Sequence, residues 1–268
     1  MVASLACLGA VVDAAGGVLE VDLVFPRNET YAPPTDSIPV VFAFQNAAFA
    51  QYLNHKISYT VRNQSDLAGN PILSFNHDLR WANWSSHEPY LVAAFHEILK
   101  TEGRWRLTWS VNWQSCEEDS FPALGSGRGL IGNDSTWSVD FAVEKGAQTV
   151  DLVAATANDK TCPAELGVAI NVTGKTVKVP SSANWSGGDT CAVVASSSPT
   201  PTANPCRVKI DSTAASSLSA SWTAELCGSL NPPASCPSKN AAAGTQRLAV
   251  AGAACLGVTL GALGFFLA

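Results

Sequence analysis

Aromatic rings are the side chains of this chain with the clearest potential for ligand chemistry, because it contains eight tryptophans. An exposed indole ring can stack on the flat face of a sugar, and a contiguous exposed aromatic patch marks a binding site. Trp105, Trp109 and Trp113 share one face of an alternating run, which is typical of a strand core. The candidates for a sugar-binding platform are therefore Trp81, Trp84, Trp137 and Trp185.

Ionisable side chains show no spacing typical of a metal or catalytic site. The four histidines form neither His-Glu-x-x-His nor His-x-x-x-His, so the sequence predicts no metal ligand and no cofactor. Glycoside hydrolysis needs two carboxylates set a fixed distance apart, whereas Glu117, Glu118 and Asp119 are adjacent and typical of a solvated loop. No Gly-x-Ser-x-Gly elbow is present either. The sequence thus predicts no catalytic residue.

The composition is that of a folded domain without a nucleic-acid partner. Hydrophobic residues make up 47% of the chain and charged residues 14%, which is enough apolar material to bury a core. The net charge is −6, and no basic stripe runs through the sequence. A nucleic-acid partner is therefore not expected.

The cysteines predict a disulfide-bonded protein from an oxidising compartment. Two of the eight, Cys7 and Cys255, lie in apolar segments at the two ends. Removal of both segments leaves an even number, which predicts three disulfides, although spacing leaves their pairing open. The six remaining cysteines are Cys116, Cys162, Cys191, Cys206, Cys227 and Cys236.

Asn-x-Ser/Thr sequons predict sites of N-glycosylation at surface loops or strand edges. A single sequon is weak evidence because the pattern is short, but six sequons in a chain with export signals support one another. They begin at Asn28, Asn63, Asn83, Asn133, Asn171 and Asn184.

The first residues resemble a signal peptide. An apolar stretch from Met1 to Val12 precedes a run of small residues, and we expect cleavage after Ala14 or Gly16. No Lys or Arg stands before the apolar stretch, so we expect residues 1–16 to be a signal peptide that is truncated at its start. The alternative is that this segment is the first buried strand of the domain.

The last residues predict attachment of a glycosylphosphatidylinositol (GPI) anchor. Residues 248–268 carry no charge, a short polar spacer precedes them, and small residues precede the spacer. This pattern is typical of an anchor signal that is removed, here residues 241–268, with attachment at Asn240 and with Ser238 and Gly244 as the alternative attachment residues. No Lys or Arg follows the apolar segment, which favours an anchor over a retained transmembrane helix. The expected partner is then the outer leaflet of the plasma membrane.

Alternation of apolar and polar residues dominates the chain and predicts strands. The clearest run is 104–114, and similar runs occupy 19–25, 39–44, 57–61, 136–143, 150–154, 168–172, 176–179 and 191–195. A helix is expected near the C-terminus, where Asp211 can cap it, Leu218, Trp222 and Leu226 recur at helical spacing, and Gly228 can end it. The same stretch also alternates, so a strand is the alternative. We predict a mainly β fold, an antiparallel immunoglobulin-like β-sandwich over 18–230, followed by a short stalk at 231–240.

Several long segments resemble a family of secreted fungal proteins that is defined only as a domain of unknown function. They include VLEVDLVFPRNETYAP, PVVFAFQNA, HDLRWANWSSH and TEGRWRLTWSVNWQSC, and the resemblance covers nearly the whole chain from Val18 onward. It implies a surface glycoprotein, GPI-anchored in many members. It implies no activity, substrate or catalytic residue.

The combined expectation is a non-enzymatic, GPI-anchored glycoprotein of the cell surface or cell wall, with a role in wall organisation, adhesion or carbohydrate binding. The expected ligand is a cell-wall polysaccharide. One alternative is an enzyme that remodels wall polysaccharide, and the other is a purely structural spacer with neither a cleft nor an aromatic patch. A cleft with facing carboxylates beside an exposed tryptophan would favour the enzyme, and a flat aromatic face with scattered acids would favour binding.

Overall fold

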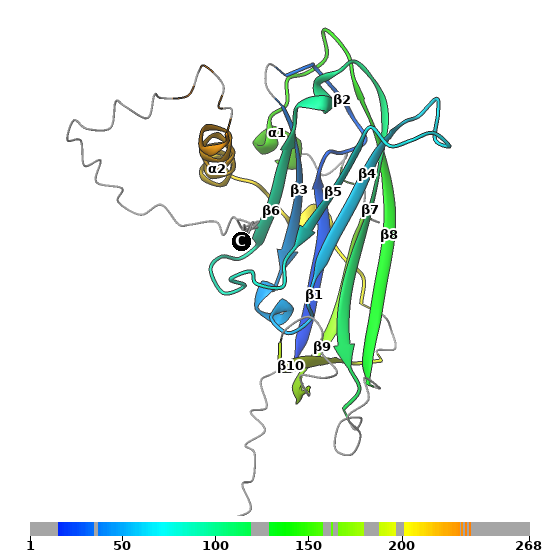
Figure 1. The fold of residues 1–268 in the computed structure, drawn as a ribbon, viewed down its shortest axis with the longest axis vertical. Coiled ribbons are helices and arrows are strands. Elements are labelled where there is room, and N and C mark those ends of the chain that lie inside the picture. The colour runs from blue at the N-terminus through cyan, green and yellow to red at the C-terminus, as the bar shows by residue number, and fades with distance from the viewer. Residues whose placement is uncertain are drawn as a thin grey trace, which may run out of the picture.

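The computed structural model describes residues 16–34, 37–118, 129–157, 162, 166–179, 188–196, 201–230, 232, 234 and 236. Within these residues ten strands form one sheet (Figure 1). The strands are β1 (Gly17–Phe25), β2 (Thr30–Tyr31), β3 (Ile38–Gln45), β4 (Lys56–Asn63), β5 (Leu73–Asp78), β6 (Tyr90–His96), β7 (Gly103–Cys116), β8 (Leu130–Val143), β9 (Gly167–Lys178) and β10 (Thr190–Val194).

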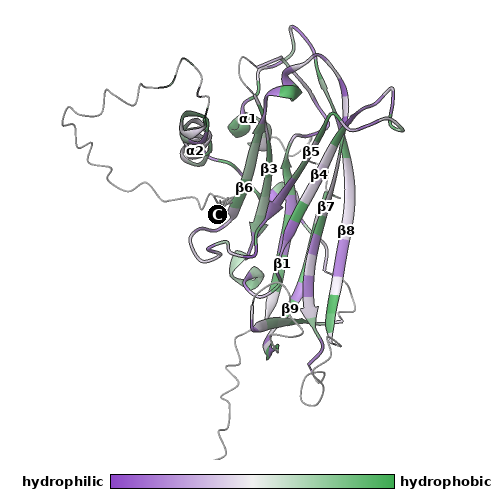
Figure 2. Ribbon diagram, viewed as in Figure 1, coloured by the Kyte–Doolittle hydropathy of each residue, from purple (hydrophilic) through white to green (hydrophobic). Residues whose placement is uncertain are grey.

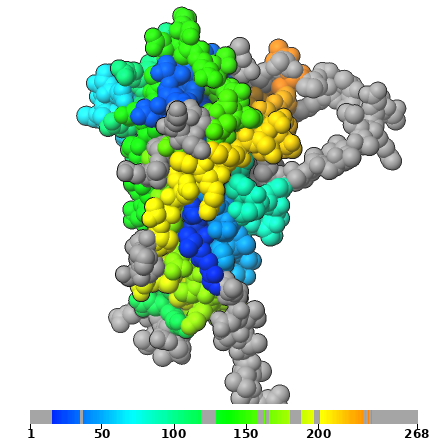
Figure 3. All heavy atoms as spheres, turned by 180° about the vertical axis from the view of Figure 1, so that it is seen from behind, coloured from blue at the N-terminus to red at the C-terminus, as the bar shows by residue number. Residues whose placement is uncertain are grey.

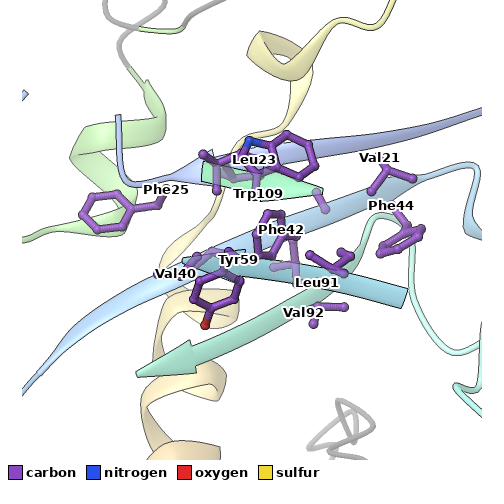
Figure 4. Packing of buried hydrophobic residues seen from close by; sticks show 14 of the residues in the cluster. Val21, Leu23, Phe25, Val40, Phe42, Phe44, Tyr59, Leu91, Val92 and Trp109 are labelled. Atoms are coloured by element: carbon purple, nitrogen blue, oxygen red, sulfur yellow. The ribbon is translucent and has the colours of Figure 1, made fainter. Parts of the chain in front are cut away.

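The sheet folds back on itself so that two halves face each other. Its path is β2-β8-β7-β10-β9-β1-β3-β6, with β4 paired to β7 and β5 to β4. Phe42 of β3 packs against Tyr59 of β4 and Trp109 of β7, with ring centroids 5.7 and 5.2 Å apart, although β3 pairs with neither strand (Figure 4). These contacts place the hydrophobic core between the two halves.

The prediction of a mainly β chain is confirmed, but the sheet is mixed. The pairings β10–β7 and β2–β8 are parallel, so the expectation of purely antiparallel strands is wrong for these two. The parallel bridge of Val193 to Cys116 joins the end of β7 to the other half of the sheet. The immunoglobulin-like topology stays a prediction.

Burial follows the alternation of the sequence where one face of a strand is solvated. In β7, Trp105, Leu107, Trp109 and Val111 are buried while the residues between them are more exposed. The strands β1 and β3 do not show this alternation of buried and exposed residues. The strand β3 is buried along its whole length. Figure 2 shows this contrast, with hydrophilic stretches along β7 and β8 and a mainly hydrophobic β3.

A layer of helices and irregular chain covers the outer face of β1, β3 and β6. The segment 201–210, with the 3₁₀ helix Pro205–Arg207, crosses β1 and buries Val208 and Ile210 (Figure 3). The helix α2 (Ser212–Gly228) lies beside β6 and stacks Trp222 on Phe95, with centroids 5.3 Å apart. The chain thus has a third layer over the more apolar half of the sheet.

The C-terminal helix begins and ends where the sequence predicts. Asp211 Oδ1 accepts a hydrogen bond from the backbone N–H of Ala214 at 2.7 Å, which is the N-cap interaction expected of an aspartate. Gly228 is the last helical residue, and Leu218 is buried. The predicted helix is confirmed.

The predicted strand at 150–154 is wrong. These residues enter α1 (Leu152–Ala157), a short helix whose start is capped by Asp151, because Asp151 Oδ1 accepts from the N–H groups of Val153 and Ala154. A short apolar run has no decisive period, so periodicity alone does not separate a strand from a helix here. The cap at Asp151 favours the helix.

Three disulfides are present, as the sequence predicts. They join Cys116 to Cys191, Cys162 to Cys206 and Cys227 to Cys236. Disulfides persist in oxidising compartments, so they fit an extracellular or secreted protein.

Among the residues that the structure describes, no helix has the length and apolar character needed to span a membrane. The expected anchor site Asn240, the tail 241–268 and most of the stalk 231–240 lie outside the described residues. The same holds for the expected signal peptide up to residue 15.

Candidate functional site

Trp81 is the most exposed tryptophan of the described residues, with 68% of its surface accessible. It lies in the turn after β5, and that turn is held by two backbone hydrogen bonds. The N–H of Leu79 donates to the carbonyl of His55 at 3.0 Å, and the N–H of Ala82 donates to the carbonyl of Leu79 at 3.1 Å. The turn therefore presents the indole to solvent from a fixed backbone.

Trp84 has the opposite role, since only 6% of its surface is exposed. Its ring packs on Phe44 and Tyr90, with centroids 4.8 and 5.1 Å apart, and also contacts His55. Burial lowers the pKa of His55 to about 3, so this ring is neutral at physiological pH and behaves as part of the core. Trp84 thus anchors the loop that displays Trp81.

A hollow of about 280 Å³ lies beside Trp81. Its walls include Gln51, Tyr52, Asn54, Arg80 and Asp189. A second aromatic ring is available here, because Tyr52 is 37% exposed. The hollow therefore combines exposed rings with amide and charged groups.

Asn54 lines this hollow and is held in a fixed position. Its backbone is left-handed, with φ 47°, a conformation that asparagine tolerates better than most residues. Its Nδ2 donates to Gln114 Oε1 at 2.9 Å, and the Gln114 N–H donates to the carbonyl of Leu53 at 2.8 Å. The loop is thereby tied to β7.

A second hollow, of about 580 Å³, shares Asn54 with the first. The two together are called the Asn54 groove below. The second part is rich in side-chain amides and is lined by Asn54, Lys56, Asn112, Trp113, Gln114, Gly132, Asn133 and Asp134. Trp113, which the alternation predicts as a core residue, is only half-buried and lines this part.

The groups in the Asn54 groove suit a polyhydroxylated ligand. Amide side chains both donate and accept, which matches the hydroxyls of a sugar, and exposed indole supplies an apolar face. Arg80 Nε donates to both carboxylate oxygens of Asp78, at 2.8 and 3.0 Å. The hydrogen bonds from Arg80 lower the pKa of Asp78, so this pair stays charged at the edge of the groove.

Carboxylates are not gathered in the groove. Asp189 lines the part of the groove beside Trp81, and Asp134 lines the amide-rich part. A separate acidic pair, Glu20 and Asp22, is buried beneath the segment 201–207, and both carboxylates accept hydrogen bonds from Gln45 Nε2. Burial raises the pKa of Asp22 to about 7, but the pair lines neither part of the Asn54 groove.

The remaining predicted aromatic residues are not brought to the groove. Trp137 is half-buried and stacks on Trp109, with centroids 4.7 Å apart. Trp185 and the sequon residue Asn184 lie outside the described residues. The structure therefore leaves Trp81 as the exposed member of the predicted platform, with Trp84 beneath it.

The described sequons fall into two groups. Asn28, Asn63 and Asn83 are exposed, as glycan acceptors should be. Asn133 and Asn171 are half-buried in β8 and β9. Asn133 Nδ2 donates to Ser115 Oγ at 3.1 Å and lines the groove, so a glycan there would compete with a ligand.

Sequence reasoning missed Tyr52, Asn54 and Gln114. The alternation of 104–114 does place Asn112 and Gln114 on the polar face, which was the available signal. Asn54 carries no such signal, because its position depends on a left-handed turn and on a partner sixty residues away.

Comparison with known proteins identifies a family but no function. No curated protein and no solved structure matches the chain. A family model described as a domain of unknown function, DUF7136, matches residues 14–236. This match covers the β sheet, the groove and all three disulfides. The chain therefore belongs to the DUF7136 family.

Proposed function

We propose that this protein is a non-enzymatic glycoprotein of the cell surface whose Asn54 groove binds carbohydrate, with cell-wall polysaccharide as the ligand class. The observation that carries the proposal is the exposed Trp81 ring beside a fixed, amide-rich groove. A flat aromatic face next to paired donors and acceptors suits a sugar, since the ring contacts the C–H face and the amides contact the hydroxyls.

Binding is favoured over hydrolysis by the placement of the acids. Glycoside hydrolysis uses two carboxylates that flank the scissile bond. Asp134 and Asp189 lie in different parts of the Asn54 groove, and Asp189 is exposed. The groove thus offers scattered acids and an aromatic platform, which supports a binding protein. A polysaccharide-remodelling enzyme stays the alternative.

A glycan array tests the ligand class. The full chain, purified in detergent, is expected to retain oligosaccharides of wall polysaccharides, and the Trp81→Ala variant is expected to retain about tenfold less, because one stacking ring is lost. Leu67→Ala is the matched control, since Leu67 is an exposed apolar residue that does not line the groove. Absence of binding to any wall glycan would contradict the proposal.

The proposed setting is the outer face of the plasma membrane, with an immunoglobulin-like sandwich held there by a GPI anchor at Asn240. The facing halves of the sheet support the sandwich, and the disulfides support an oxidising compartment. The exposed sequons Asn28, Asn63 and Asn83 support glycosylation. The anchor itself rests on the small residues, spacer and apolar tail of the sequence.

Enzymatic release tests the anchor. Treatment of intact cells with a phosphatidylinositol-specific phospholipase C is expected to release the protein into the supernatant, because only the lipid would hold it. Mass spectrometry of the released chain should find no peptide from residues 248–268. Retention on the cells of a chain that still contains these residues would contradict a GPI anchor.

A further inference from the structure

Trp81 stands two residues before Asn83, the acceptor of the sequon Asn83-Trp84-Ser85 in the loop between β5 and β6. No other sequon of the chain has an aromatic residue at the corresponding position, where the residues are Pro26, Val61, Ile131, Ala169 and Ser182. Among the described residues, the most exposed tryptophan therefore stands next to a predicted point of glycan attachment.

The loop presents Trp81 and Asn83 on its solvent side. The N–H of Trp84 donates to the carbonyl of Ala82 at 3.1 Å, and the N–H of Ser86 donates to the carbonyl of Asn83 at 3.2 Å. The Trp84 side chain packs into the core, whereas Trp81 and Asn83 are both exposed. The buried Trp84 ring thus fixes which side of the loop faces the core and leaves the other two side chains to solvent.

The amide of Asn83 can accept a sugar without loss of a hydrogen bond. Its Oδ1 accepts from Ser85 Oγ at 3.0 Å, and its Nδ2, the atom that an N-glycan is joined to, makes no hydrogen bond to any residue that the structure describes. At Asn133, by contrast, Nδ2 donates to Ser115 Oγ at 3.1 Å and to the carbonyl of Ile131 at 3.2 Å. Glycan attachment would disturb these two bonds but none at Asn83.

A sugar on Asn83 lies within reach of the Trp81 ring. Two residues of chain span at most about 7 Å, so the attachment point and the indole are neighbours. The first sugar of an N-glycan is N-acetylglucosamine, which has an apolar C–H face that an indole can stack on, and stacking removes apolar area of both partners from water. Asn83 does not line the hollow beside Trp81, so its glycan approaches the ring from outside that hollow.

We propose that Asn83 carries an N-glycan whose first N-acetylglucosamine stacks on Trp81. This inference rests on the glycosylation that belongs to the proposed function. With 68% of its surface accessible, Trp81 has both faces of its ring open to solvent, so a sugar on one face leaves the other to a ligand in the Asn54 groove. The glycan then holds the ring in place, and a ring already in place loses less conformational entropy when the ligand binds.

Peptide mass spectrometry of the full chain from a eukaryotic host tests the attachment. The tryptic or chymotryptic peptide that contains Asn83 is expected to carry N-acetylglucosamine. An unmodified Asn83 in every copy would overturn the proposal, and it would do so without contradicting carbohydrate binding in the Asn54 groove.

Removal of single glycans tests the stacking contact. Ser85→Ala deletes the sequon of Asn83 and is expected to lower the melting temperature by about 3 °C, because one aromatic contact is lost. Ser65→Ala is the matched control, since Ser65 Oγ donates to Asn63 Oδ1 at 2.8 Å as Ser85 does to Asn83, but the residue two before Asn63 is the buried Val61. The control should leave the melting temperature nearly unchanged.

A double-variant cycle assigns the effect to the indole. In the Trp81→Ala background, Ser85→Ala is expected to cause no further change in melting temperature, because the sugar has no ring to stack on. In the Trp81 protein it should also weaken binding of wall oligosaccharide about threefold. The melting temperatures remain informative even if no oligosaccharide binds. Equal shifts for Ser85→Ala and Ser65→Ala, or an equal effect of Ser85→Ala with and without Trp81, would overturn the proposal.

Discussion

As the pH rises from 4 to 8, the unfolding free energy of the Asp22→Asn variant is expected to increase by about 4 kcal/mol relative to that of the wild type. Asp22 is fully buried, and burial raises its pKa from 3.8 to about 7 against the opposing hydrogen bond from Gln45. One oxygen, Oδ1, has no hydrogen-bond partner among the residues that the structure describes. The carboxyl is therefore neutral in the folded protein over a pH range in which it is charged in the unfolded chain.

The sign follows from the order of the two pKa values. The folded value lies above the unfolded one, so the contribution of this group is fully present below about pH 3.8 and is lost as the pH rises through about 7. Asparagine resembles the neutral carboxyl at every pH and does not incur this loss. The buried His55, whose pKa is lowered, destabilises the fold in acid, but it does so equally in both proteins and cancels in the difference.

Urea unfolding at pH 4, 6 and 8 measures this difference. Asp140→Asn is the matched control, because hydrogen bonds from Arg106 lower the pKa of Asp140 and the same substitution should then give a small loss at neutral pH. A stability difference between Asp22→Asn and the wild type that stays constant over this pH range would contradict a raised pKa.

Removal of the Cys116–Cys191 disulfide by a double alanine substitution is expected to cost about 4 kcal/mol of unfolding free energy. The two cysteines are separated by 75 residues, so the cross-link removes much entropy from the unfolded chain. The bond also joins β7 to β10 where Cys116 and Val193 form a parallel bridge. The loss should appear in urea unfolding.

The Cys227–Cys236 disulfide supplies the comparison. It closes a separation of only 9 residues after α2, so its removal is expected to cost about 2 kcal/mol less than removal of the first. Equal losses of unfolding free energy in the two double variants would contradict the expectation, because they would show that loop length does not set the stability that each disulfide contributes.

The sequence predicts the parts of the fold that depend on period and caps. The run 104–114 becomes β7, and Asp211 and Gly228 bound α2 as expected. The edge strands β5 and β6 were missed for reasons of length and composition. In β5, Leu73, Phe75 and His77 alternate with polar residues over only six positions, and β6 is apolar over nearly its whole length and has no decisive period. The two parallel pairings depend on contacts between distant segments, which no local pattern encodes.

The candidate site was predictable only in part. The sequence names Trp81 as one of four candidate platform tryptophans, whereas the separation of roles between Trp81 and Trp84 depends on which ring reaches Phe44. Asn54 and Gln114 meet through tertiary structure.

Isothermal titration calorimetry of the best wall oligosaccharide into the full chain and its Trp81 variants tests the central claim most directly. The proposed groove predicts that Trp81→Ala weakens binding about tenfold or more and that Trp81→Phe, which keeps a stacking ring, retains most of the affinity. Leu67→Ala should bind like the wild type. Undiminished affinity in Trp81→Ala would contradict a carbohydrate site in the Asn54 groove.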